Sequence, residues 1–342
     1  MTRLINGRYA RQILLPQLGE SGQHRLLGSR VTLVGCGALG TTIANLLVRA
    51  GIGHLRIIDR DFIELNNLHR QSLFCESDVD NNLPKAIAAA ARLSQINAEC
   101  EIEPVVDDLN FKNALELLAG SDVVLDGLDN FHSRYVVNDA CVKLNIPWIY
   151  GGCVGTNGLV MTIRPGISPC LRCVFPIPAP MGFTQTCDTA GVLNTTAMLV
   201  AAYQATETVK LLIHKEQDCL DGLLDLDGWK HETRTVSTQL DPACECCAQK
   251  HFPFLEGHGG MELVSLCGRE AVQVVRESDV TLDLEEMANQ LAPLGEVKRT
   301  RFLLKFYVQG LEFTLFRNGR ALIMGTSNIT IAKNLYAKYI GA

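Results

Sequence analysis

The chain has 342 residues, of which 31 are basic and 37 acidic, giving a net charge of −6. This balance excludes a strongly basic nucleic-acid-binding protein. A 47% hydrophobic fraction with 20% charged residues excludes intrinsic disorder as the main state. At about 150 residues per domain, the length predicts about two domains.

The 13 cysteines are too few for a small disulfide scaffold, and their odd number prevents complete pairing within the chain. Residues 1–11 contain no continuous apolar run typical of a signal peptide, and no apolar stretch reaches membrane-spanning length. We therefore expect a cytoplasmic protein with reduced thiols and with neither a membrane nor a nucleic acid as partner.

The first 150 residues alternate short apolar runs with helical patterns. Strands are expected at residues 30–35, 55–59, 101–106, 122–126 and 147–150. Helices are expected at residues 38–50, 84–97, 111–119 and 131–144. Strands that alternate with helices predict an α/β fold with a doubly wound, mostly parallel, Rossmann-like sheet.

The pattern changes after residue 150. The expected elements are a glycine-rich β segment at 151–164, an irregular crossover at 164–193, a long apolar helix at 195–213, two strands within 220–236 and a cysteine-dense tail at 241–248. These segments complete a first domain, 1–250, with a nucleotide-binding half, about 1–150, and a carrier and zinc half, about 151–250.

Proline and glycine then predict a linker at 251–261. Residues 262–342 predict a small α+β domain without a catalytic constellation, with strands at 271–276, 301–308, 312–316 and 320–324 and helices at 282–294 and 329–340.

Gly35, Gly37 and Gly40 form the pattern G-x-G-x-x-G between a predicted strand and a predicted helix. In this context the glycines permit a tight turn, close approach of phosphates and helix–strand packing. Asp59 ends the second strand, 19 positions after Gly40, where an acid is expected to bind ribose hydroxyls. These features predict an adenine nucleotide, with NAD as the default.

Further polar side chains follow the predicted strands and argue against a dehydrogenase. They are Asn67, Arg70, Gln71, Lys85, Asp126, Asp129 and Asn130. Arginine, lysine and carboxylate groups that converge at strand ends suit a triphosphate and its Mg²⁺. Hydride transfer does not require such a set. Arg70 or Lys85 taken alone is better explained as a solvated surface charge, but for the whole group at strand ends that explanation is the weaker one.

Two C-x-x-C pairs supply four thiolates, the ligand set of a structural tetrahedral Zn²⁺. The ligands predicted are Cys170, Cys173, Cys244 and Cys247, although Cys246 leaves the choice of the fourth ligand open. Cys187 stands in a loop-like segment before a helix. A low-pKa thiol there would be a competent nucleophile, and a spectator thiol is an equally good interpretation.

The glycine motif, Asp59, the Asn67–Gln71 run, Lys85, the Asp129–Asn130 pair and the paired C-x-x-C motifs together resemble the ThiF/MoeB family of ubiquitin-activating-enzyme-like adenylyltransferases. The resemblance covers about residues 5–250. Residues 262–342 look like the carboxyl-terminal extension of some bacterial ThiF-like proteins.

The resemblance implies a reaction. The carboxyl-terminal Gly-Gly carboxylate of a ubiquitin-like sulfur carrier would attack the α-phosphate of ATP, giving an acyl-adenylate and pyrophosphate. The pathway would be thiamine-thiazole, molybdopterin or related sulfur transfer, with a cysteine desulfurase or another sulfur donor as a further partner. Which carrier is used does not follow from this sequence.

The resemblance also implies residue roles. Arg70 and Lys85 would offset phosphate charge, Asp129 would bind Mg²⁺, and Cys187 would link covalently to the carrier. Arg11 would reach the ATP of a partner subunit, which implies a homodimer. The implied nucleotide-binding set is Arg11, Gly35, Gly37, Gly40, Asp59, Asn67, Arg70, Gln71, Lys85, Asp129 and Asn130.

Three alternatives stay open from the sequence. A nicotinamide-dependent oxidoreductase would use the glycine motif and Asp59 but leaves Arg70, Lys85 and both C-x-x-C pairs unexplained. A non-catalytic module would bind a carrier without adenylating it. The same chemistry could also serve a natural-product or tRNA-thiolation pathway.

Overall fold

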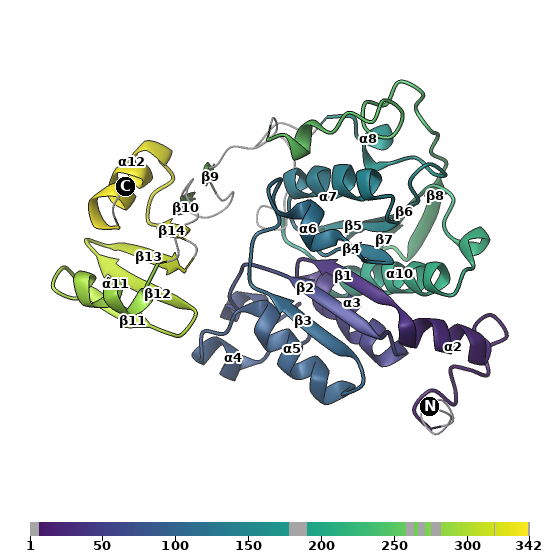
Figure 1. Ribbon diagram of the computed structural model, residues 1–342, viewed down its shortest axis with the longest axis horizontal. Helices are drawn as coiled ribbons and strands as arrows, with labels where there is room; N and C mark the ends of the chain where they lie inside the picture. Colours follow the sequence, from purple (N-terminus) through teal and green to yellow (C-terminus); the bar gives the residue numbers. More distant parts are fainter. Residues whose placement is uncertain are drawn as a thin grey trace. The chain divides into compact units, whose positions relative to one another are not determined.

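The computed structural model describes residues 7–177, 190–257, 263–265, 271–274, 282–317 and 319–340 (Figure 1). The chain divides into two compact units, residues 1–259 and 260–342. Each unit has its own sheet, with two apolar cores in the first unit and one in the second.

The first unit is built on an eight-stranded sheet with the order β3-β2-β1-β4-β5-β6-β7-β8. Its strands are β1 (Arg30–Val34), β2 (His54–Ile58), β3 (Glu101–Val105), β4 (Val123–Asp126), β5 (Trp148–Val154), β6 (Asn157–Ile163), β7 (Leu223–Asp227) and β8 (Glu232–Val236). Neighbours from β3 to β5 are parallel, and those from β5 to β8 are antiparallel. The expected α/β class with a mostly parallel central sheet is confirmed, and the glycine-rich segment after residue 150 adds the antiparallel half.

Helices cover both faces of this sheet (Figure 1). They are α2 (Gly19–Gly28), α3 (Ala38–Ala50), α4 (Glu76–Asp80), α5 (Lys85–Ile96), α6 (Ala114–Leu118), α7 (Phe131–Leu144), α8 (Leu171–Val174) and α10 (Asn194–Leu212), with short 3₁₀ turns η1 (Leu65–Asn67), η2 (Glu216–Asp218) and η3 (Pro253–Leu255). Helices α3, α5 and α10 share one core with Leu33, whereas α6 and α7 share the other core with Val34. Successive strand residues point to opposite faces, so a strand buried on both sides is apolar throughout.

The second unit is an antiparallel sheet with the order β11-β12-β13-β14-β10-β9 and two helices. Its elements are β9 (Leu263–Ser265), β10 (Ala271–Val274), α11 (Leu284–Leu291), β11 (Glu296–Arg299), β12 (Leu303–Val308), β13 (Leu311–Phe316), β14 (Ala321–Met324) and α12 (Ile329–Tyr339). Apolar residues of α11 and α12 pack with alternate residues of the strands, such as Phe306 and Phe313. Strand β11 was not expected, because its exposed sequence Glu-Val-Lys-Arg carries little apolar signal.

The segment expected to start the linker is packed against the first unit. Phe252, Phe254 and Leu255 contact the core that contains α7, and the Phe254 ring lies 4.8 Å from that of Tyr135. Proline and glycine predicted a linker here, but the aromatic rings pack against the first unit, and their burial stabilises the turn η3.

Among the described residues, none of the helices combines the length and apolar character that crossing a bilayer requires.

Candidate functional site

The glycine motif lies at the point where the chain leaves β1 in one direction and β4 in the other. In open α/β sheets, ligands bind at such a switch point, outside the carboxyl ends of the strands. The loop after β1 begins with Gly35 and the loop after β4 begins with Gly127. A Cβ on Gly35 would lie 2.5 Å from the Gly127 oxygen, and a Cβ on Gly127 would lie 2.3 Å from the Gly35 oxygen. Two glycines therefore let the two loops pack backbone against backbone.

The three glycines of the motif differ in what surrounds them. A Cβ on Gly40 would lie 2.1 Å from the Gly35 oxygen, so close packing of helix against loop requires glycine there. Gly37 caps α3, and a Cβ on it would come no nearer than 3.9 Å to any atom. Close packing explains why residue 40 is a glycine, but it does not explain why residue 37 is one. Open space at the amino end of a helix is where phosphate oxygens are bound.

The carboxylate of Asp59 lies directly beneath the glycine loop. It accepts hydrogen bonds from the Cys36 N–H at 2.6 Å and from the Asp61 N–H at 2.7 Å. Burial raises the pKa of Asp59, whereas Lys85 and the two N–H donors counteract that rise. Asp59 thus holds the glycine loop, and ribose binding by its remaining lone pairs stays a prediction.

Lys85 is the first residue of α5 and is buried beside two carboxylates. Its Nζ lies 3.1 Å from Oδ2 of Asp61. Burial alone would lower the pKa of Lys85, but Asp61 and Asp59 outweigh burial and raise it. Lys85 is therefore a fixed, charged group at physiological pH and is not a solvated surface lysine.

Arg60 adds a second fixed cation, which the sequence analysis missed. Its Nη1 lies 2.6 Å from Oδ2 of Asp108. Burial disfavours its charged form, but Asp108 and Asp61 outweigh burial and raise its pKa. The charged run Asp59–Asp61 directly after β2 was the available signal, because residues at a strand's carboxyl end face the crevice.

Asp129 is exposed in the loop after β4. Its negative charge contributes to the raised pKa of Lys85, Arg60 and Arg134, so it lies within electrostatic reach of all three cations. Asn130 caps α7, because its Oδ1 accepts a hydrogen bond from the Ser133 N–H at 2.9 Å. This cap gives Asn130 a structural role, whereas Asp129 remains available to a cation.

The run from Asn67 to Gln71 lies beside the glycine loop. Gln71 Nε2 donates to Asn67 Oδ1 at 2.9 Å and lies 3.9 Å from the Cβ position of Gly37. Gln71 Oε1 is buried without a hydrogen-bond partner among the described residues. A buried oxygen of this kind can accept a hydrogen bond from a bound ligand or from water. Arg70 is half-buried in the same turn, and its Nη1 donates to the Asn66 oxygen at 2.9 Å.

Arg11 lies away from the crevice of its own chain. Its neighbours Gln12 and Tyr9 bind the Ala50 oxygen at the end of α3 and the Asn97 amide after α5. Helix α3 begins at the glycine loop and has 13 residues, so its far end lies about 20 Å from that loop. Arg11 itself is exposed. Cys187 lies outside the described residues.

A buried ion pair behind the crevice was also missed. Arg134 Nε pairs with Asp126 Oδ2 at 2.8 Å, and Arg134 Nη2 donates to the oxygens of Leu128 and Gly151. Burial raises the pKa of Asp126, and Arg134 opposes that rise. The pair joins the loop after β4 to β5. Asp126 was noticed in the sequence, but nothing in the sequence assigned Arg134 to it.

The four predicted metal-ligating cysteines converge. The sulfurs of Cys170, Cys173, Cys244 and Cys247 all lie within 4.8 Å of one another. Three of these separations are 3.9, 3.6 and 3.3 Å. Four sulfurs around a tetrahedral Zn²⁺ at about 2.3 Å would be about 3.8 Å apart, so the donor set fits such an ion. Cys246 is fully buried, and its sulfur accepts a hydrogen bond from Asn138.

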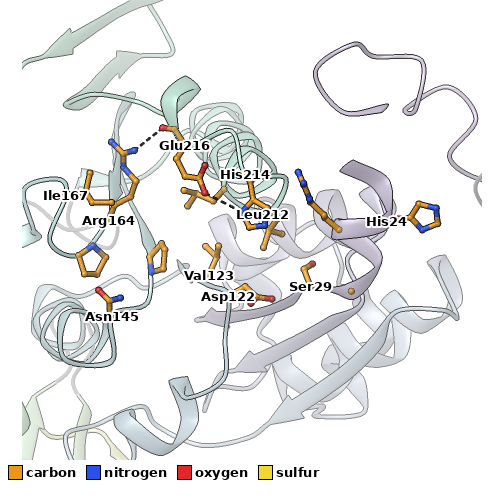
Figure 2. Close-up of a pocket in the computed structure, with 15 residues that line it drawn as sticks. His24, Ser29, Asp122, Val123, Asn145, Arg164, Ile167, Leu212, His214 and Glu216 are labelled. Carbon is orange, nitrogen blue, oxygen red and sulfur yellow. Dashed lines mark hydrogen bonds and ion pairs between the residues drawn. The ribbon is translucent and has the colours of Figure 1, made fainter. Parts of the chain in front are cut away.

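A separate cavity of about 450 Å³ lies at the opposite edge of the sheet, where β4 and β5 begin (Figure 2). Its arginines bind backbone oxygens after α10: Arg25 donates to the Ile213 oxygen that caps α10, at 2.7 Å, and Arg164 to the Glu216 oxygen in η2, at 2.9 Å. Cations favour helix carboxyl ends, so a structural role accounts for both side chains.

Comparisons with known proteins agree with this arrangement. The ThiF family matches residues 9–246, more than half of the chain. The chain belongs to the ThiF family. A protein from Bacillus subtilis (strain 168) named sulfur carrier protein ThiS adenylyltransferase is 42% identical over 341 residues, covering 98% of this chain and 100% of that protein. This relative therefore also carries the extension beyond the ThiF domain.

Other relatives share the first unit. The SAMP-activating enzyme E1 of Haloferax volcanii is 38% identical over 277 residues, covering 81% of this chain and 96% of that protein. The crystal structure of Escherichia coli MccB with ATP matches with a TM-score of 0.62 at 25% identity, covering 71% of this chain and 74% of that one. This likeness supports the fold of the first unit.

The glycines offer a paired test of the site. We expect Gly37→Ala to change the free energy of unfolding by less than about 1 kcal/mol, because its Cβ would make only ordinary van der Waals contacts at 3.9 Å. The same variant should weaken ATP binding by at least about tenfold, a cost of about 1.4 kcal/mol. Gly40→Ala should instead destabilise the fold by about 3 kcal/mol, through a clash with the Gly35 oxygen. Thermal unfolding and ATP titration measure both effects. Normal ATP affinity in Gly37→Ala would contradict the site.

The cysteine cluster makes a second prediction. The purified protein should hold one Zn²⁺ per chain, and Cys173→Ala should lose both the ion and about 3 kcal/mol or more of stability. Cys246→Ala should retain the ion, because its sulfur is not one of the four converging ligands. Metal analysis measures the zinc content of each variant, and thermal unfolding measures its stability. Zinc lost from Cys246→Ala but kept by Cys173→Ala would contradict the assignment of ligands.

Proposed function

We propose that this protein is a Mg·ATP-dependent adenylyltransferase that activates the carboxyl-terminal Gly-Gly carboxylate of a ubiquitin-like sulfur carrier. The observation that carries this proposal is 42% identity over the whole length of a ThiS adenylyltransferase. The crevice supports it, because an open glycine cradle, fixed cations and an exposed aspartate meet there. The products are the carrier acyl-adenylate and pyrophosphate.

The reaction demands stabilisation of charge more than activation of a base. The nucleophile is a carboxylate that is already ionised, while negative charge builds on the departing pyrophosphate. Lys85 is fixed in its charged form near the crevice, and Arg70 lies in the turn beside the glycine loop. We assign both side chains to the phosphates. We assign Asn67 and Gln71 to the same nucleotide site and Asp59 to the ribose.

Mg²⁺ would be held by Asp129 together with phosphate oxygens and water. Mg²⁺ prefers oxygen ligands and commonly uses one or two carboxylates beside substrate phosphates. Asp129 suits this role because its carboxylate is exposed and lies within electrostatic reach of Lys85 and Arg60. The ion supplies positive charge to the phosphates as they separate.

The four cysteines would hold a structural Zn²⁺. Such an ion would join α8, which directly follows Cys170, to the turn around Cys244 across some seventy intervening residues. Cross-linking of two distant segments by one ion stabilises the folded state because the unfolded chain lacks the site.

A homodimer with shared sites fits two further features. Helix α10 exposes Met198, Leu199 and Tyr203, and Leu46 of the adjacent α3 is also exposed, each side chain 36% to 45%. Apolar side chains gathered on packed helices are typical of a protein interface. Arg11 lies too far from its own crevice to serve it, so we assign it to the ATP of the partner subunit.

Two assignments extend the reaction beyond adenylation. Cys187 would form a covalent link with the activated carrier, and a sulfur donor such as a cysteine desulfurase would then act on that carrier. The thiamine pathway is favoured because the relative that matches the full length, including residues 260–342, is named for ThiS. The named relatives do not favour a nicotinamide-dependent oxidoreductase. Such an enzyme would also leave Arg70 and Lys85 unexplained.

Carrier-dependent ATP–pyrophosphate exchange tests the proposed function. Exchange should appear only with a β-grasp carrier ending in Gly-Gly, and a carrier lacking the last glycine should give none. Asp129→Asn should reduce exchange by at least about a thousandfold through loss of a metal ligand, with thermal unfolding unchanged. Asp122→Asn is the matched control, because it is an exposed aspartate at the other end of β4. Full exchange in Asp129→Asn would remove this residue from the reaction.

Mixed dimers test the sharing of sites. Arg11→Ala and Asp129→Ala should each be inactive alone, because each breaks both sites of its own homodimer. Random assortment of the two variants should restore about a quarter of wild-type exchange, since half of the dimers contain one intact site. No recovery after verified subunit exchange would place Arg11 outside the partner's site.

A further inference from the structure

Helix α7 carries polar residues at every fourth position along one face. Asn130 caps the helix, and Arg134 and Asn138 follow at four-residue intervals. Residues four apart share a helix face. From Asn130 to Asn138 the helix rises about 12 Å, so these side chains line a short path along α7.

The first half of this path contacts the crevice. Arg134 Nη2 donates to the Leu128 oxygen at 2.7 Å and to the Gly151 oxygen at 2.8 Å, while its Nε pairs with Asp126. Asn130 fixes the start of the helix through the Ser133 N–H. The loop that carries Asp129 is therefore tied to α7 on both sides of that residue.

The second half contacts the cysteine site. Asn138 is fully buried, and its Oδ1 accepts a hydrogen bond from the Leu171 N–H at 2.9 Å. Its Nδ2 donates to the Cys246 sulfur at 3.2 Å. Leu171 lies within the first C-x-x-C pair and Cys246 within the second. One amide group therefore holds both cysteine turns against α7.

Asp139 strengthens the same attachment. Its Oδ2 accepts a hydrogen bond from the Phe254 N–H at 3.3 Å, and its Oδ1 lies 3.7 Å from Nη1 of Arg172, inside the first cysteine pair. Figure 1 shows α8, which holds Cys173, close to α7. Asn138 donates to one cysteine turn and accepts from the other, so its amide bonds both turns directly.

We propose that Asn138 is a positioning residue that couples metal binding at the four cysteines to Mg·ATP binding in the crevice. A metal ion holds the two cysteine turns in place, and the turns hold the Asn138 side chain. Because Asn138 lies on α7, this restricts the position of α7 and therefore of Arg134 and the loop of Asp129. The inference rests on the two sites proposed above. Coupling between two ligands is reciprocal, so Mg·ATP must in turn retain the metal.

Equilibrium competition for zinc with a chromogenic chelator measures this coupling without requiring turnover. In the wild-type full chain, saturating Mg·ATP should tighten zinc binding by about fivefold, a typical coupling between sites. Asn138→Ala should remove this tightening, and so should Cys246→Ala, which removes the sulfur that accepts from Asn138. Cys141→Ala is the matched control: another fully buried cysteine, located on α7 itself, that should keep the full tightening.

Each result bears on a different part of the proposal. Equal zinc affinities with and without bound Mg·ATP in the wild type would overturn the coupling. Undiminished tightening in Cys246→Ala and in a folded Asn138→Ala would overturn the role of Asn138. If Asn138→Ala does not fold, Cys246→Ala decides. Absence of zinc by metal analysis, or of Mg·ATP binding by calorimetry, would overturn the coupling by removing one of its sites, and so would identify a failure of the proposed function itself.

Discussion

The contact between Gly35 and Gly127 is the constraint on which the site depends. Two loops from neighbouring parallel strands meet there backbone to backbone, at a distance that no side chain on either glycine would allow. This contact brings the amino end of α3 and the loop of Asp129 to opposite sides of one crevice. A Cβ on Gly37, by contrast, would lie 3.9 Å from the Gly127 oxygen, an ordinary van der Waals distance, so the amino end of α3 is less crowded than Gly35 and Gly40.

The groups around this contact are held by a chain of paired charges. Asp126 and Arg134 are both buried, and removing one partner would leave an uncompensated charge in the interior, which costs about 3–5 kcal/mol. Lys85 is also buried and charged, but the partner within 3.1 Å of its Nζ, Asp61, is exposed. Such pairs contribute little net stability compared with apolar packing. Their value here is that the charged groups are held in place before a substrate arrives.

The sequence predicted what is local and missed what is distant. Glycine spacing predicted the loop between β1 and α3, because a turn and its helix are encoded in neighbouring residues, and nucleotide binding there stays a prediction. The cysteine pairs were predicted to meet because thiol spacing reflects metal geometry, although only the folded chain distinguishes Cys247 from Cys246. Arg60 and Arg134 were missed because their partners, Asp108 and Asp126, are set by the register between strands and helices. Asn130 was assigned to the nucleotide, yet its amide caps a helix, a role that one sequence signal cannot separate from binding.

The charge balance of the crevice explains why a nucleotide would bind here together with a metal ion. Among the described residues, two fixed cations are outnumbered by four carboxylates that influence them: Lys85 and Arg60 against Asp59, Asp61, Asp108 and Asp129. A free triphosphate would add further negative charge to an already negative site. Mg²⁺ held by Asp129, as proposed above, would offset that negative charge, and Arg70 and an arginine from a second subunit would offset it further. The same carboxylates would then favour departure of pyrophosphate once the acyl-adenylate has formed, because like charges held close together repel.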